Sequence, residues 1–147
     1  MKVSDPPVII KQEFPYSLAI VWDAITQHQK MKKWFFEQIP EFKAEVGFKT
    51  QFNVQAPSRD FYHLWEVTEV IPLKRIVYNW KYKDLKGDSF VIFKLIEKDN
   101  TTQLTLTSQV TEDFDDSITE FKRESCAGGW NYFIKERLFN CLKQNND

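Results

Sequence analysis

Two histidines and two cysteines are the side chains in this sequence best suited to chemistry near neutral pH: His28, His63, Cys126 and Cys141. A catalytic zinc site generally takes three protein ligands, yet the sequence has neither H-x-x-x-H nor C-x-x-C spacing. We therefore expect no metal and no cofactor. A G-x-S-x-G motif and a phosphate-binding glycine loop are also missing from the sequence, so no catalytic residue is predicted.

His63 is the most informative titratable residue. On the inner face of a strand, it would orient a ligand or act as a general base near neutral pH. The alternative is a wall residue that hydrogen-bonds within the protein. Tyr78 and Tyr82 share the inner face of a later strand, where their hydroxyls would either reach a ligand or bond to each other or to the backbone.

The charge balance and the cysteines limit where the protein acts. With 20 basic and 21 acidic residues, the net charge is −1, whereas nucleic-acid-binding surfaces are usually strongly basic. The N-terminus lacks a signal-peptide core, and no run of about 18 apolar residues occurs. Cys126 and Cys141 would lie about 22 Å apart on one helix, too far for a disulfide. We expect a cytoplasmic protein with free thiols, no nucleic acid and no membrane insertion.

Hydrophobic periodicity predicts a strand, two short helices, five more strands and a long last helix. The strands are expected at residues 8–14, 48–54, 60–71, 74–83, 88–98 and 101–111. Ser17 can cap a helix that ends near residue 27, and a second helix covers about residues 30–36. The length suits a single domain, residues 1–147.

Alternating apolar residues give the predicted sheet one covered face. The strand at 60–71 allows two inner sets, and we favour the one with Phe61, His63, Trp65 and Val67. The last helix is expected to begin at a capping box, Ser117 and Glu120, and to end near residue 143. Its apolar stripe must pack into the curved sheet, leaving a cavity where the helix stands away from it.

Gly128 and Gly129 lie inside this last helix, although each costs roughly 1 kcal/mol there relative to alanine. Because the apolar stripe continues on both sides, the helix is expected to run through them. A helix face without side chains either lets the sheet approach closely or leaves room for a ligand.

Four stretches occur in the order found in one superfamily: VWDAI at 21–25 with WF at 34–35, EVTEVIP at 66–72 with RIVYNW at 75–80, TQLTLT at 102–107, and GW at 129–130. Each motif is weak alone. Together they resemble the START-like helix-grip proteins, in the branch of homologues of the activator of the heat-shock-protein-ninety ATPase. The resemblance covers about residues 8–142.

The resemblance implies an α+β helix-grip fold, a six-stranded curved antiparallel sheet wrapped around a long C-terminal helix. It implies a cavity that in relatives takes hydrophobic small molecules, and, from the cochaperone, a link to the stress response. The sequence holds no counterpart of the cochaperone's separate N-terminal domain, which disfavours a chaperone partner. Trp65 stands where many relatives have glycine, which would bring a large ring close to the cavity.

We therefore expect a non-enzymatic protein that binds a hydrophobic or lipid-like small molecule in the cavity. Two alternatives stay open: a cochaperone-like protein that stimulates a chaperone ATPase, and a pocket enzyme of cyclase or hydrolase type. The exposed sheet face and free edges also permit a homodimer. The cavity is expected to be lined by Thr50, Phe52, His63, Trp65, Tyr78, Trp80, Phe93, Gly129, Trp130 and Phe133.

Overall fold

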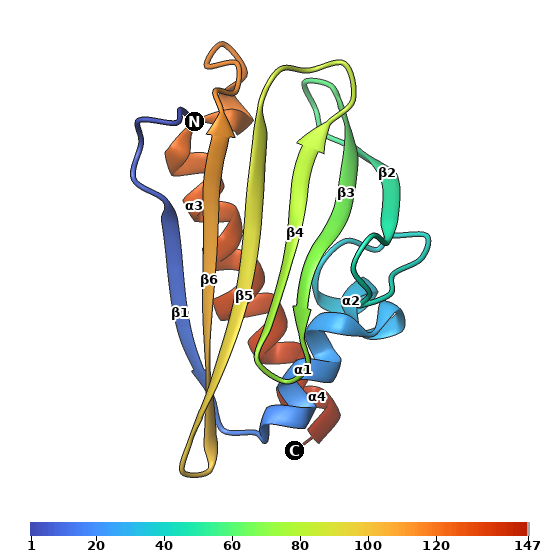
Figure 1. Cartoon of the computed structure of the whole chain (residues 1–147), viewed down its shortest axis with the longest axis vertical. Coiled ribbons are helices and arrows are strands. Elements are labelled where there is room, and N and C mark those ends of the chain that lie inside the picture. The colour runs from blue at the N-terminus through green and yellow to red at the C-terminus, as the bar shows by residue number, and fades with distance from the viewer. Residues whose placement is uncertain (147) are drawn as a thin grey trace.

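A computed structural model describes residues 1–146, in which six strands form one antiparallel sheet. The strand order is β1-β6-β5-β4-β3-β2, so β1 and β2 are the edges (Figure 1). The strands are β1 (Val8–Phe14), β2 (Lys49–Gln55), β3 (Asp60–Ile71), β4 (Arg75–Tyr82), β5 (Asp88–Lys98) and β6 (Thr101–Glu112). Each predicted strand is confirmed to within about two residues, the usual uncertainty of strand ends.

Two short helices and one long one complete the fold. The short helices are α1 (Leu18–Thr26) and α2 (His28–Trp34). The long C-terminal helix consists of α3 (Arg123–Asn131), a π-helical segment (Tyr132–Leu138) and α4 (Phe139–Asn146), and it lies across one face of the curved sheet (Figure 1). The helix-grip architecture expected from the sequence is confirmed.

The start of the long helix differs from the prediction. Ser117 does not cap it, because the Ser117 amide and hydroxyl both donate to Asp115 Oδ1, at 2.9 and 2.6 Å. Glu120 instead accepts a hydrogen bond from Ser58. A 3₁₀ turn (Thr119–Phe121) comes first, and the α-helix begins only at Arg123. The middle of the helix is π-helical, which the sequence pattern did not indicate.

The apolar alternation places the expected side chains inside. On β3, the inner set containing Phe61, His63, Trp65 and Val67 is buried, as predicted. Cross-strand register aligns Trp65 with Trp80 and Trp80 with Ser89, so one row of inner side chains crosses three strands. The main core lies between this face and the helices, with Trp34 fully buried and its indole bonded to the Ala24 carbonyl at 2.8 Å.

A second, smaller apolar cluster closes the end of the sheet near the start of α3. Its buried members are Phe61, Phe114, Ile118 and Phe121. The space between this cluster and the main core holds the candidate site. Among residues 1–146, no helix is long and apolar enough to cross a membrane.

Candidate functional site

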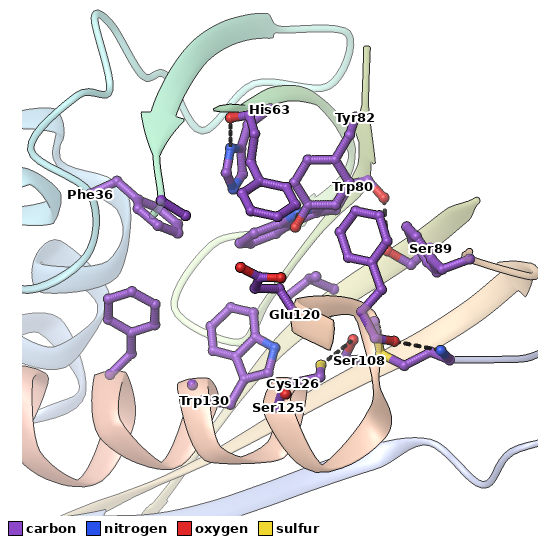
Figure 2. Close-up of a pocket in the computed structure, with 18 residues that line it drawn as sticks. Phe36, His63, Trp80, Tyr82, Ser89, Ser108, Glu120, Ser125, Cys126 and Trp130 are labelled. Atoms are coloured by element: carbon purple, nitrogen blue, oxygen red, sulfur yellow. Dashed lines mark hydrogen bonds between the residues drawn. The ribbon is translucent and has the colours of Figure 1, made fainter. Parts of the chain in front are cut away.

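A cavity of about 330 Å³ lies between the long helix and the sheet (Figure 2). On one side, its wall is formed by aromatic rings of the main core, Phe36, Trp80, Trp130 and Phe133. On the other side, the wall comes from the smaller cluster, Phe61, Phe114 and Phe121. A volume of this size accommodates a small organic molecule.

The cavity exists because small side chains occupy inward positions where the neighbouring rows carry large ones. Ser89 and Ser108 lie on the inner face of β5 and β6, each two residues from a buried apolar residue. Cys126 and Gly129 face them from α3. Large rings at these four positions would fill the space, as they do in the main core.

The two glycines of α3 have different surroundings. Apart from the neighbouring residues and nearby backbone of its own helix, a methyl group added to either Gly128 or Gly129 would meet no atom of residues 1–146 within 4 Å. Gly129 lines the cavity, whereas Gly128 is exposed to solvent. Of the two explanations offered by the sequence, room beside the helix therefore fits Gly129, and close approach of the sheet fits neither glycine.

His63 reaches the cavity from β3 and is only 4% exposed. Its Nδ1 lies 2.9 Å from the Phe61 carbonyl oxygen, which can only accept, so Nδ1 carries the proton. Burial lowers the pKa of His63 to about 4, although the hydrogen bond to Phe61 acts in the opposite direction. The ring is therefore neutral at physiological pH, and Nε2 is a hydrogen-bond acceptor.

Tyr82 lies directly opposite His63 on β4, with ring centroids 4.8 Å apart. Its hydroxyl oxygen accepts a hydrogen bond from Trp80 Nε1 at 2.9 Å. Burial raises the pKa of the Tyr82 hydroxyl, so the phenol keeps its proton. In Figure 2 the Tyr82 hydroxyl and the second nitrogen of His63 both face the cavity interior.

Most other polar groups of the wall already have partners. The Ser89 hydroxyl donates to the Trp80 carbonyl at 2.7 Å, and the Ser125 hydroxyl donates to the Thr119 carbonyl at 3.0 Å. Cys126 is a free thiol whose Sγ lies 3.9 Å from Ser108 Oγ. Burial raises the pKa of Cys126, which favours the unreactive thiol over the thiolate.

The predicted lining residues divide into two groups. His63, Trp80, Gly129, Trp130 and Phe133 do line the cavity. Thr50, Phe52, Trp65, Tyr78 and Phe93 lie outside its wall; Thr50 is half-buried, and the other four belong to the main core. The Trp65 ring packs against Phe35 and Trp80, so it fills interior space next to the cavity.

Several lining residues were not singled out from the sequence. The inner-face positions of Ser89 and Ser108 follow from strand alternation, so small residues within a buried stripe were an available signal. Phe114 and Phe121 lie in an irregular segment, where periodicity predicts no facing direction. Phe36 lies two residues beyond the end of α2, and no sequence pattern indicated that its side chain faces the cavity.

The acidic segment before α3 binds the first residues of the chain. Asp113 accepts a hydrogen bond from the Val3 amide at 2.7 Å, and Asp116 forms ion pairs with Lys2 and the Met1 amine. Met1 itself lines the cavity. These carboxylates therefore fix the first residues of the chain beside the cavity.

The sequence matches the model of a known protein family. A family model described as "Activator of Hsp90 ATPase homolog 1-like protein" matches residues 15–143. The chain belongs to this family. The match spans α1 through most of α4 and so includes every strand except β1. A sequence search of curated proteins finds no match.

Solved structures share the fold at low sequence identity. Protein CV1439 from Chromobacterium violaceum superimposes with a TM-score of 0.78 at 20% identity, over 93% of this chain and 96% of that one. Protein MLL2253 from Mesorhizobium loti gives 0.76 at 23% identity, over 97% and 99%. DynU16, a protein in the dynemicin biosynthetic locus, gives 0.76 at 20% identity over 96% of this chain. This chain spans about half, 48%, of the DynU16 chain.

Proposed function

We propose that this family member is a non-enzymatic binding protein that holds a hydrophobic small molecule in the cavity between the long helix and the sheet. The observation that carries the proposal is the cavity of about 330 Å³ with mostly apolar walls that are rich in aromatic rings. An apolar ligand would remove the aromatic surface of these walls from water, which is the main source of affinity for such molecules.

The surroundings of His63 support binding rather than catalysis. General acid and base catalysis requires a group that titrates near the working pH, whereas the pKa of His63 is lowered to about 4. Among residues 1–146, the hydrogen-bond partner of His63 is a backbone carbonyl and not a carboxylate. Glu120 lies in the cavity wall but is bonded to Ser58.

The two adjacent glycines provide a matched test. The probe is N-phenyl-1-naphthylamine, a neutral dye whose fluorescence rises in apolar surroundings. We expect saturable binding to the wild type. Gly129→Leu places an apolar side chain in the cavity, where it occupies space that the dye would fill. The dissociation constant should rise by about tenfold or more, which corresponds to the loss of one small apolar contact between dye and protein.

Gly128→Leu is the control, because it adds the same side chain one residue away on the exposed face. It should bind the dye as the wild type does. Circular dichroism of both variants would verify that the helix is intact. Absence of saturable binding in the wild type, or equal binding by the two variants, would contradict the proposal.

A further inference from the structure

Two polar atoms facing the cavity have hydrogen-bonding capacity that the protein leaves unused. His63 Nε2 has a lone pair and no hydrogen-bond partner within the described part of the chain, because Nδ1 makes the bond to Phe61. The Tyr82 oxygen already accepts from Trp80, so its own proton remains to be donated. One atom is thus an acceptor and the other a donor.

These two atoms belong to one pair of facing residues. His63 and Tyr82 are direct cross-strand neighbours on β3 and β4, and their rings meet edge to face at 4.8 Å. Aromatic rings hold the pair in place: Phe52 stacks on His63 at 4.8 Å, and Phe121 lies 4.9 Å from Tyr82. A ligand group that donates to one atom and accepts from the other would satisfy both at once.

The charges around the cavity select against an anionic ligand. Among the described residues, no lysine or arginine side chain lines the cavity. The Met1 amine at its edge is already bound to Asp116 and, at 2.5 Å, to the Phe121 carbonyl. The charged side chain in the wall is the Glu120 carboxylate. The carboxylate of a bound ligand would therefore lose its hydration without gaining an ion pair with a cation of the protein.

We infer that the cavity selects a neutral apolar molecule carrying a hydroxyl group, which donates to His63 Nε2 and accepts from the Tyr82 hydroxyl. A hydroxyl is the smallest group with both functions. This inference rests on the proposed function, since it specifies the polar end of the ligand that the apolar walls enclose. It makes His63 and Tyr82 the residues that determine specificity.

Four probes with one ring system separate these contributions: naphthalene, 2-methoxynaphthalene, 2-naphthol and 2-naphthoate. Naphthalene offers no hydrogen bond, the ether only accepts, the naphthol donates and accepts, and the naphthoate is an anion. Equilibrium dialysis near neutral pH should rank naphthol first, then the ether, then naphthalene. Naphthol should bind about tenfold more tightly than naphthalene, as two modest hydrogen bonds allow, and naphthoate should bind most weakly.

Two variants assign the bonds to residues. Tyr82→Phe should remove the advantage of the ether over naphthalene. His63→Leu should remove the advantage of naphthol over the ether. Tyr62→Phe is the control, because Tyr62 lies on the other face of β3 with Lys83 over its ring; it should leave the ranking unchanged. Tyr82→Phe is conservative, so the test holds even if His63→Leu does not fold.

The outcomes distinguish this inference from the proposed function. If the three neutral probes bind with equal affinity, or if naphthoate binds most tightly, the hydroxyl inference is overturned while apolar binding stands. If none of the four binds and the dye also fails to bind, both are overturned. An unchanged ranking in Tyr82→Phe would likewise overturn the role of that residue.

Discussion

Burial among aromatic rings keeps the His63 side chain neutral. The side chain is 4% exposed and is enclosed by the rings of Phe36, Phe52 and Trp80. Protonation would place a positive charge among these rings, where none of the described carboxylates is bonded to it. The pKa of about 4, against an ordinary value of 6.5, expresses this cost.

This lowered pKa predicts a dependence of stability on pH. Between pH 6.5 and about 4 the unfolded chain binds a proton at His63 that the folded protein does not, so the free energy of unfolding falls as pH decreases through this window. Above pH 6.5 the residue contributes no pH dependence. The loss should approach about 3 kcal/mol at the lower end, at 1.36 kcal/mol per pKa unit.

Urea denaturation of the wild type and of His63→Gln at several pH values would measure the effect. The variant should lack this part of the pH dependence. Hydrogen bonds and nearby positive charges also lower the pKa values of three carboxyl groups, those of Asp115, Asp116 and Glu120. The stability that these carboxylates provide is lost as they become protonated at low pH. Because both proteins contain them, this loss is the same in the wild type and the variant. Parallel curves for the two proteins between pH 4 and 6.5 would contradict the prediction.

The alternation of apolar and polar residues along β3 was enough to predict that the His63 side chain points inward. It was not enough to predict which of its two nitrogens is free. That depends on the Phe61 carbonyl, which accepts from Nδ1, and on Tyr82 being opposite across the strand pair. Tyr78 illustrates the limit, since it has the same inward alternation as Tyr82 but lies in the main core.

Among the connecting segments, the turn between β4 and β5 determines how the cavity is closed. Gly87 in this turn has a φ of +116°, which side chains with a Cβ rarely adopt. A Cβ built on Gly87 would overlap the ring of Phe114, one of the cavity walls. The glycine therefore allows Phe114 to cover the cavity.

Gly87→Ala should destabilise the protein by about 1 to 3 kcal/mol, from backbone strain together with displacement of the Phe114 ring. Chemical denaturation would measure the change. Gly47 provides the matched control, because its φ is also positive, at +90°, but an added Cβ meets no atom within 4 Å. Gly47→Ala should therefore show the backbone cost alone, and equal losses in the two variants would mean that the Phe114 contact is unimportant.

The helices show where reasoning from local sequence succeeds and fails. Ser17 does cap α1, accepting a hydrogen bond from the Ile20 amide at 3.3 Å. Ser117 and Glu120 form a capping-box pattern, which is a stronger sequence signal, but Ser117 is bonded to Asp115 and Glu120 accepts a hydrogen bond from Ser58. The second outcome depends on partners that tertiary structure supplies, so a capping box in the sequence did not determine the helix start.

The arrangement of the whole molecule was predictable because alternation, turns and the helical stripe agree with one another. The position of the cavity was not. It lies toward one end of the interior because Trp65, Tyr78 and Phe93 fill the rest, while Ser89, Ser108, Cys126 and Gly129 leave space. Differences in side-chain volume predict the position of a cavity only when the strand register is known, because the register determines which residues lie side by side.

A ligand held in this cavity touches both the sheet and the long helix, so its binding should stabilise the entire fold. A ligand at about 100 times its dissociation constant adds about 2.7 kcal/mol to the free energy of unfolding. For a chain of this size, that should raise the Tm by about 5 to 10 °C. Differential scanning calorimetry with and without N-phenyl-1-naphthylamine would measure the shift. Gly128→Leu should show the full shift and Gly129→Leu about half of it or less, since tenfold weaker binding at the same dye concentration adds only about 1.4 kcal/mol. A dye that binds without raising the Tm would indicate attachment outside the cavity.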